Sequence, residues 1–268
     1  MNMMKKIAFA SVLLPLATAV CAAEAEKTEE VQDMSDPTAV YSQGGVGVTN
    51  KGLNFKYGQS YDTGNPTKMG MNVLEIIGVG GEAVGWDSND VKDNSVDSIR
   101  FRNFELNTVN GRGTQIDMTY SVDSEQGTAG YSFIQALPKM GIFQFFPLAG
   151  AGVAFGNDVQ EYDSQGNPTH IDTGYSTKGT YTMVGMYSKI TITDKFWLNY
   201  NPFYLSTLSG SDHYKDNAYG VDQDSLLTHE FAASYQITPR MNVRYFANWN
   251  EEVDFVDGDH RVEVNYQF

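Results

Sequence analysis

The feature that most constrains the fold is an alternation of apolar and polar side chains that recurs in segments of about ten residues. In the segment QIDMTYSVD every second residue is apolar, from Ile116 to Val122. The same alternation recurs in residues 227–237, 241–249 and 261–268. Successive side chains of a strand point to opposite faces, and about ten residues is the length that a tilted strand needs to cross a bilayer. The pattern therefore predicts amphipathic strands and hardly any helix.

The connections between these strands alternate in length. Counted back from the C-terminus, a longer link, a short turn, a long loop, a short turn and a long loop occupy residues 250–259, 238–240, 207–224, 193–194 and 156–176. Short turns at one end and long loops at the other are the signature of an outer-membrane barrel. A secreted sandwich or soluble barrel is the alternative, but it gives no reason for this alternation.

Twelve strands are predicted, at residues 41–49, 52–61, 68–86, 97–109, 113–123, 128–137, 142–155, 177–192, 195–206, 225–237, 240–250 and 259–268. An even number places both chain ends on the side of the short turns. Ten or fourteen strands are the alternatives, because the start of the chain can form one hairpin or a strand and an unpaired arm. The predicted fold is an all-β, transmembrane, antiparallel up-and-down β-barrel over residues 41–268.

The first 40 residues are predicted to lie outside the barrel. Residues 1–23 are typical of a cleaved secretory signal peptide, because Lys5 and Lys6 precede a short apolar stretch that ends in small residues. Cys21 is the one cysteine and falls within this leader, so disulfides and thiolate sites are excluded from the mature chain. Residues 24–40 are acidic and lack periodicity, which predicts a flexible segment.

The charge balance narrows the partners. The full sequence carries a formal net charge of −15, and such a surface repels phosphates, so a nucleic-acid partner is not expected. A mean hydropathy of −0.36 excludes a helical membrane protein but not a barrel, whose wall turns half of its residues away from lipid.

The chain ends on RVEVNYQF, which places Val264, Tyr266 and the terminal Phe268 on one apolar face. This ending resembles the C-terminal signal that the barrel-assembly machinery reads, and the whole mature chain resembles a Gram-negative outer-membrane β-barrel of the porin-like class. The resemblance implies location in the bacterial outer membrane and contact with its lipid and lipopolysaccharide. It also implies that the barrel-assembly machinery is a partner.

The charged residues on the polar faces are predicted to line the lumen. They are Lys56, Arg100, Arg102, Glu105, Asp117, Glu230, Arg244, Arg261 and Glu263, together with Glu75. Charge is nearly balanced in this set, so the lumen is either a water-filled pore or a packed network of ion pairs.

Strict alternation breaks in the segment IRFRNFEL, residues 99–106. The break after Arg102 predicts a bulge near Asn103 that returns Phe104 and Leu106 to the lipid-facing side.

Acidic residues gather in the loops and are predicted to form a rim outside the cell. The rim comprises Asp212, Asp216, Glu251, Glu252, Asp254, Asp257 and Asp259. Such a rim would concentrate cations and could hold Ca²⁺ or Mg²⁺, whereas a merely solvated set of loops is the alternative. Residues 254–259 offer oxygen ligands without EF-hand spacing, so a metal site stays undefined.

The predicted function is passive diffusion of small solutes or ions through a mixed-charge, porin-like channel without a cofactor. A plugged structural barrel whose acidic loops act as an adhesion or phage-receptor surface is the alternative. A lipid-modifying enzyme is a remote alternative, for which His229 and Ser206 are the one candidate pair, and the chain is not predicted to be an enzyme.

Overall fold

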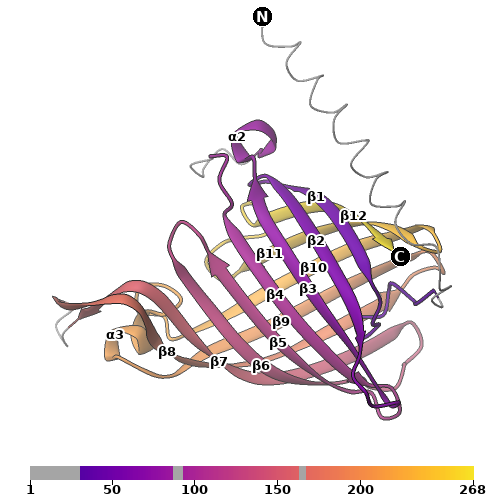
Figure 1. Cartoon of the computed structure of the whole chain (residues 1–268), viewed down its shortest axis with the longest axis horizontal. Helices are drawn as coiled ribbons and strands as arrows, with labels where there is room; N and C mark the ends of the chain where they lie inside the picture. Colours follow the sequence, from indigo (N-terminus) through magenta and orange to yellow (C-terminus); the bar gives the residue numbers. More distant parts are fainter. Residues whose placement is uncertain (1–30, 87–92, 163–166) are drawn as a thin grey trace, which may run out of the picture.

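A computed structural model of the chain describes residues 31–86, 93–162 and 167–268. Within it twelve antiparallel strands close into one barrel, in which each strand pairs with its neighbours in sequence and β1 pairs with β12 (Figure 1). The strands are β1 (Gln43–Thr49), β2 (Leu53–Asp62), β3 (Lys68–Val79), β4 (Ser98–Asn107), β5 (Arg112–Ser121), β6 (Gln126–Gln135), β7 (Phe143–Tyr162), β8 (Pro168–Thr191), β9 (Phe196–Gly210), β10 (Ser225–Thr238), β11 (Met241–Asn250) and β12 (Asp259–Gln267). The predicted fold class and strand number are confirmed.

The short connections are turns closed by their own side chains. In the turn after β4, Asn107 Oδ1 accepts hydrogen bonds from the backbone N–H groups of Val109 at 3.0 Å and Asn110 at 3.3 Å. Gly111 then takes a φ of 67°, which glycine adopts at little cost. We call the end of the barrel that carries such turns the short-turn end and the opposite end the long-loop end.

The long-loop end is more regular than the sequence predicts. Strands β7 and β8 continue to pair past residues 155 and 177, and together they form a hairpin that projects from the barrel (Figure 1). The predicted loop 207–224 contains the end of β9 and the short helix α3 (Asp212–Asn217), and α2 (Gly81–Val84) replaces the predicted end of the third strand. The backbone hydrogen bonds between paired strands do not depend on an apolar face, so strand pairing continues in this region.

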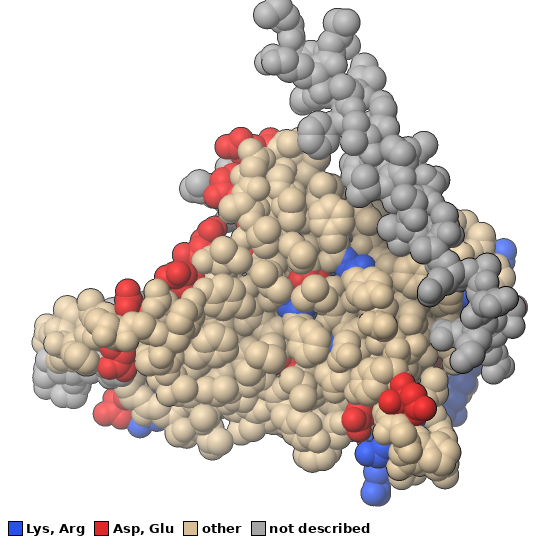
Figure 2. Space-filling view, in the orientation of Figure 1, with Lys and Arg blue, Asp and Glu red and all other residues tan. Residues whose placement is uncertain are grey.

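The barrel has an apolar outside and a polar inside. Exposed apolar side chains follow the outer faces of the strands, and Phe133 is 64% exposed. Fully buried side chains include the polar Asn54, Asn242, Glu263 and Gln267. Figure 2 shows a wall that is mostly uncharged between its ends, with acidic residues gathered towards the long-loop end. This inverted arrangement suits a wall that faces lipid and encloses a polar interior, and it places the chain in the bacterial outer membrane.

In the three ranges that the structure describes, no helix combines the length and the apolar character needed to cross a membrane.

The predicted bulge near Asn103 is wrong. Strand β4 pairs with β3 and with β5 in unbroken register along its whole length. Phe104 and Leu106 therefore face the inside of the barrel, where they pack against Val40 and its neighbours Met71 and Val73.

The prediction that Glu105 lines the lumen is wrong for the same reason. With the alternation unbroken, Glu105 falls on the outer face beside Lys68 at the short-turn end, and its Oε2 lies 3.4 Å from the Lys68 ammonium. The usual arrangement of a polar inner face and an apolar outer face is reversed at this point of β4. It is reversed because the segment before β1 supplies apolar contacts inside the barrel.

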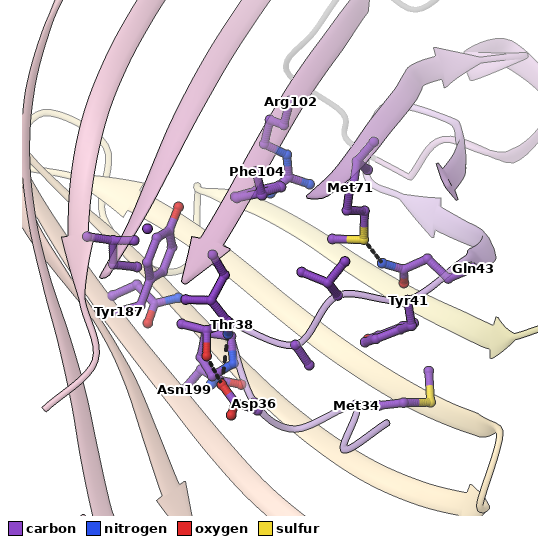
Figure 3. Close-up of a pocket in the computed structure, with 18 of the residues that line it drawn as sticks. Met34, Asp36, Thr38, Tyr41, Gln43, Met71, Arg102, Phe104, Tyr187 and Asn199 are labelled. Carbon is purple, nitrogen blue, oxygen red and sulfur yellow. Dashed lines mark hydrogen bonds between the residues drawn. The ribbon is translucent and has the colours of Figure 1, made fainter. Parts of the chain in front are cut away.

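That segment, residues 31–42, enters the barrel at the short-turn end (Figures 1 and 3). Met34 and Val40 are buried against the inner wall, as is the ring of Tyr41. The sequence predicts a flexible segment over 24–40, whereas the described part of it packs inside the barrel. The predicted leader, residues 1–23, and residues 24–30 lie outside the described residues.

Candidate channel lumen

The inner wall carries a buried ion pair that reaches across a strand of glycines. Lys56 on β2 donates to Glu263 on β12, and Asn54 Nδ2 donates to the other carboxylate oxygen at 3.0 Å. The side chain of Glu263 is 0% exposed and that of Lys56 is 8% exposed. Strand β1 lies between them, and its Gly45 and Gly47 pair with Lys56 and Glu263 respectively. Because these glycines have no side chains, the lysine and the carboxylate meet above them.

A second cluster continues the charges along the wall. The Glu75 carboxylate accepts a hydrogen bond from Arg102 Nη2 at 2.7 Å and lies 4.0 Å from Arg261 Nη1. Arg261 Nε lies 3.4 Å from Glu263, so this arginine links the two clusters.

The third cluster crosses the lumen. Arg100 Nε donates to Asp117 Oδ1 at 2.9 Å, and Gln115 Nε2 donates to the same carboxylate at 3.0 Å. The Tyr187 hydroxyl donates to Gln115 Oε1 at 3.3 Å. Tyr187 lies on β8 and Gln115 on β5, which are three strands apart, so this contact spans the inside of the barrel.

We call the charged members of these three clusters the ion-pair belt. The belt comprises Lys56, Glu75, Arg100, Arg102, Asp117, Arg261 and Glu263. Between the two states that the sequence leaves open, a wet pore or a packed network, the geometry at this level is a packed network.

The two remaining predicted lumen residues lie on β11 and β10, the strands that follow β12 around the barrel, and Arg244 is the cross-strand partner of Glu263. Arg244 donates to Ser234 Oγ at 2.9 Å and to Asn199 Oδ1 at 3.0 Å, and its guanidinium lies 4.6 Å from the centre of the Phe246 ring. Glu230 accepts from Asn201 Nδ2 at 2.6 Å. In the described part of the chain no carboxylate lies within ion-pair distance of Arg244, so neutral groups and an aromatic face stabilise this charge.

Sequence reasoning missed residues that complete the lumen, namely Tyr187, Lys189, Gln115, Asn199 and Asn201. Tyr187 and Lys189 occupy alternate positions of the predicted strand 177–192, and this alternation was the available signal. No local sequence pattern predicts the contact between Tyr187 and Gln115 across the lumen, because the two residues are 72 positions apart.

Two cavities flank the belt. An inner cavity of about 170 Å³ lies between the belt and the segment 34–41 (Figure 3), and an outer vestibule of about 630 Å³ opens below the long loops. The two cavities share no lining residue among those described. The ring of Tyr181 lines the vestibule and fits over Gly152, where a Cβ would lie 2.5 Å from it. Tyr187 lines the inner cavity and Tyr181 lines the vestibule, six positions further towards the long-loop end of β8.

The acidic rim makes local contacts. Asp212 and Asp259 pair with Lys215 and Lys51 at 2.7 and 2.9 Å, and the hydrogen bond from Lys215 lowers the pKa of the Asp212 carboxyl. The other rim acids either accept hydrogen bonds within the loops or stand exposed: Asp216, Glu251, Glu252, Asp254 and Asp257. Within the described ranges no group of three His, Cys, Asp or Glu side chains is arranged to hold a metal ion.

The candidate catalytic pair is not assembled. His229 pairs with Pro202 and Ser206 pairs with Ser225 in the same ladder, so the two side chains are four positions, or roughly 13 Å, apart. The His229 ring stacks on Trp249, and its Nδ1 lies 2.8 Å from the Tyr200 hydroxyl. These are the contacts of an aromatic girdle at a membrane boundary.

The C-terminal residues close the barrel. The backbone N–H of Phe268 donates to the carbonyl of Ser42 at 3.1 Å, and the Phe268 ring meets Tyr266 edge to face at 5.9 Å. Val264 faces outwards and pairs with Val46 of β1. The three side chains of the predicted assembly signal thus share the outer face.

No protein-family model matches the chain, and no curated protein sequence matches it. Solved structures do resemble it. The COG4313 outer membrane channel from Pseudomonas putida F1 superposes with a TM-score of 0.53 at 8% identity, over 91% of this chain and 100% of that one. The NanC porin superposes with a TM-score of 0.52 at 8% identity, over 85% of this chain and 100% of that one. The chain therefore has the fold of the porin-like β-barrels of the bacterial outer membrane.

Proposed function

We propose that the protein is a porin-like channel that lets small polar solutes or ions diffuse across the outer membrane. The observation that carries this proposal is a polar interior that holds an inner cavity beside the ion-pair belt and a larger vestibule below the long loops. An apolar core would fill a purely structural barrel at lower electrostatic cost, since buried ion pairs rarely add net stability.

The ion-pair belt suggests how solutes would be selected. Arginines and carboxylates alternate along the belt, so a solute of either sign finds a counter-charge there. The Tyr187–Gln115 hydrogen bond is long at 3.3 Å, so its displacement costs little and would widen the lumen beside the inner cavity. At physiological salt the acidic rim acts within about 8 Å, which enriches cations at the outer mouth only.

Liposome swelling tests the proposal directly. Liposomes that hold the refolded protein should swell in small uncharged solutes at rates that fall steeply as the solute grows. A barrel that is folded, as shown by its shifted migration on a gel before heating, but that permits no more swelling than empty liposomes would overturn the proposal.

Neutralising three lumen arginines should change ion selectivity. Replacing Arg100, Arg102 and Arg244 by glutamine removes three positive charges from the lumen, so the reversal potential in a KCl gradient should shift towards cation preference. Glu105→Gln is the matched control, because Glu105 lies on the outer face and its loss should leave the reversal potential unchanged. Unchanged selectivity in a conducting triple variant would remove these arginines from the mechanism.

A specific observation also favours the alternative of a plugged barrel with a receptor surface. The belt and residues 31–42 occupy the lumen, while the β7–β8 hairpin projects well beyond the wall. Shortening the tips of 156–176 and 207–224 discriminates between the two functions, because a receptor for a phage or an adhesion partner loses binding while a channel keeps conducting.

The C-terminal residues are proposed to serve assembly. Deleting Phe268 removes both a ring on the outer face and the last hydrogen bond to Ser42, so the barrel-assembly machinery should insert less of the protein. The amount of heat-modifiable protein in outer-membrane fractions should fall severalfold. Gln267→Asn, whose side chain lies inside, is the control and should insert normally.

The aromatic girdle is the proposed contact with lipopolysaccharide. On the outer face the rings of Tyr200, His229 and Trp249 stack on one another, and Phe255 meets both Trp249 and His260 edge to face. Rings with polar tips favour such an interface.

A further inference from the structure

Because Glu105 lies on the outer face, the side chains that line the lumen carry more positive than negative charge. Six basic and four acidic side chains face inwards around the belt and the inner cavity: Lys56, Arg100, Arg102, Lys189, Arg244 and Arg261 against Glu75, Asp117, Glu230 and Glu263. The belt contains four of these basic and three of the acidic side chains, whereas Lys189 and Arg244 stand against Glu230 alone, so each group contributes one surplus positive charge.

Lys189 and Arg244 flank one asparagine. Arg244 Nη2 donates to Asn199, and the register of β8 and β9, which pairs Ile190 with Leu198, places Lys189 opposite Asn199. Lys189 is only 11% exposed and lies 2.8 Å from the carboxylate of Asp33. The buried lysine thus meets its counter-charge in the inserted segment, where Asp36 adds a second acidic group.

The segment touches the wall mainly through apolar atoms. The Met34 sulfur accepts long hydrogen bonds from Gln236 and Asn242 at 3.4 and 3.7 Å, and Val40 packs on the cluster around Met71.

Two of its acidic side chains accept hydrogen bonds from within the segment itself. Asp33 Oδ1 accepts from the backbone and hydroxyl of Ser35, and Asp36 Oδ1 accepts from those of Thr38 (Figure 3). Asp33 itself is 62% exposed, so its pair with Lys189 is a weak tether. Asp33 and Asp36 therefore keep these hydrogen bonds if residues 33–40 leave the wall, whereas Ser42 stays bonded to Ser60 and to the Phe268 N–H.

We propose that residues 33–40 are an anionic plug, and that their withdrawal opens the short-turn end of the lumen to small anions. This inference rests on the proposed channel function. The acidic segment occupies the place at which a solute carboxylate or a chloride ion would meet Lys189 and Arg244, so the plug both narrows the path and cancels the surplus positive charge.

Three variants test the plug in planar bilayers with a KCl gradient. A mature chain that begins at Tyr41 keeps all twelve strands and should conduct more than the native chain, with a chloride-to-potassium permeability ratio higher by a factor of about two to five. Asp33→Asn with Asp36→Asn keeps the apolar anchors and should raise the permeability ratio in the same direction. Adding Lys189→Gln to the shortened chain should reverse most of the gain in chloride preference.

The outcomes separate the plug from the channel. If the native and shortened chains conduct alike with the same reversal potential, the plug is overturned and the channel stands. If both chains fold but neither conducts, both proposals fail. If the shortened chain does not fold, an unchanged permeability ratio in the Asp33→Asn, Asp36→Asn variant overturns the plug by itself.

Discussion

Glu263→Gln is expected to destabilise the barrel by about 3–5 kcal/mol, the usual cost of removing one partner of a buried ion pair. Glu263 is fully buried and faces both Lys56 and Arg261, so glutamine would leave two cations without their shared carboxylate. The measurement is the urea concentration at which the heat-modifiable form is lost.

A double variant distinguishes this charge effect from simple loss of packing. Lys56→Met with Glu263→Leu replaces the pair by apolar groups of similar size, and such replacements are often neutral or stabilising, so most of the stability should return. Glu105→Gln breaks the exposed pair with Lys68 and should cost no more than about 1 kcal/mol. Equal stabilities for Glu263→Gln and Glu105→Gln would contradict the account of the belt.

Tyr187→Ala is expected to raise the single-channel conductance several-fold. The Tyr187 ring makes the hydrogen bond across the lumen to Gln115 and packs edge to face on Phe203 at 5.3 Å. Its removal takes away a side chain that bridges the lumen beside the inner cavity, so the path through the barrel should widen.

The control for this variant is a tyrosine on the other side of the same wall. Tyr200 lies on the outer face beside His229, so Tyr200→Ala removes a ring of equal size without touching the lumen. Its conductance should equal that of the native chain. If both variants conduct like the native protein, the constriction does not lie at Tyr187.

The periodicity of the sequence was sufficient to predict which side chains of the wall face outwards, because every spanning strand separates lipid from a polar interior. Ile116 and Met118 face outwards and Asp117 faces inwards as predicted, and no other contact overrides that rule in β5. In β4 the rule fails at Phe104 and Glu105, because the inner face there meets residues of the inserted segment instead of water. The strand alone carries no sign of this partner.

The inserted segment shows why composition alone gives a wrong prediction of flexibility. Residues 24–40 are as acidic as a flexible tail, but Met34 is buried, and Val40 packs against Met71 and Val73, which lie about 30 residues later in the chain. Contacts between distant residues, such as Tyr187 with Gln115, likewise depend on barrel closure and leave no local pattern.

Single-channel recording of the refolded mature protein in a planar bilayer, with a KCl gradient across it, tests the channel most directly. The account predicts small, steady openings for the native chain and larger ones for Tyr187→Ala. Silence from both proteins, when each is a folded and heat-modifiable barrel, would contradict it, because the lumen would then offer no path between its two cavities.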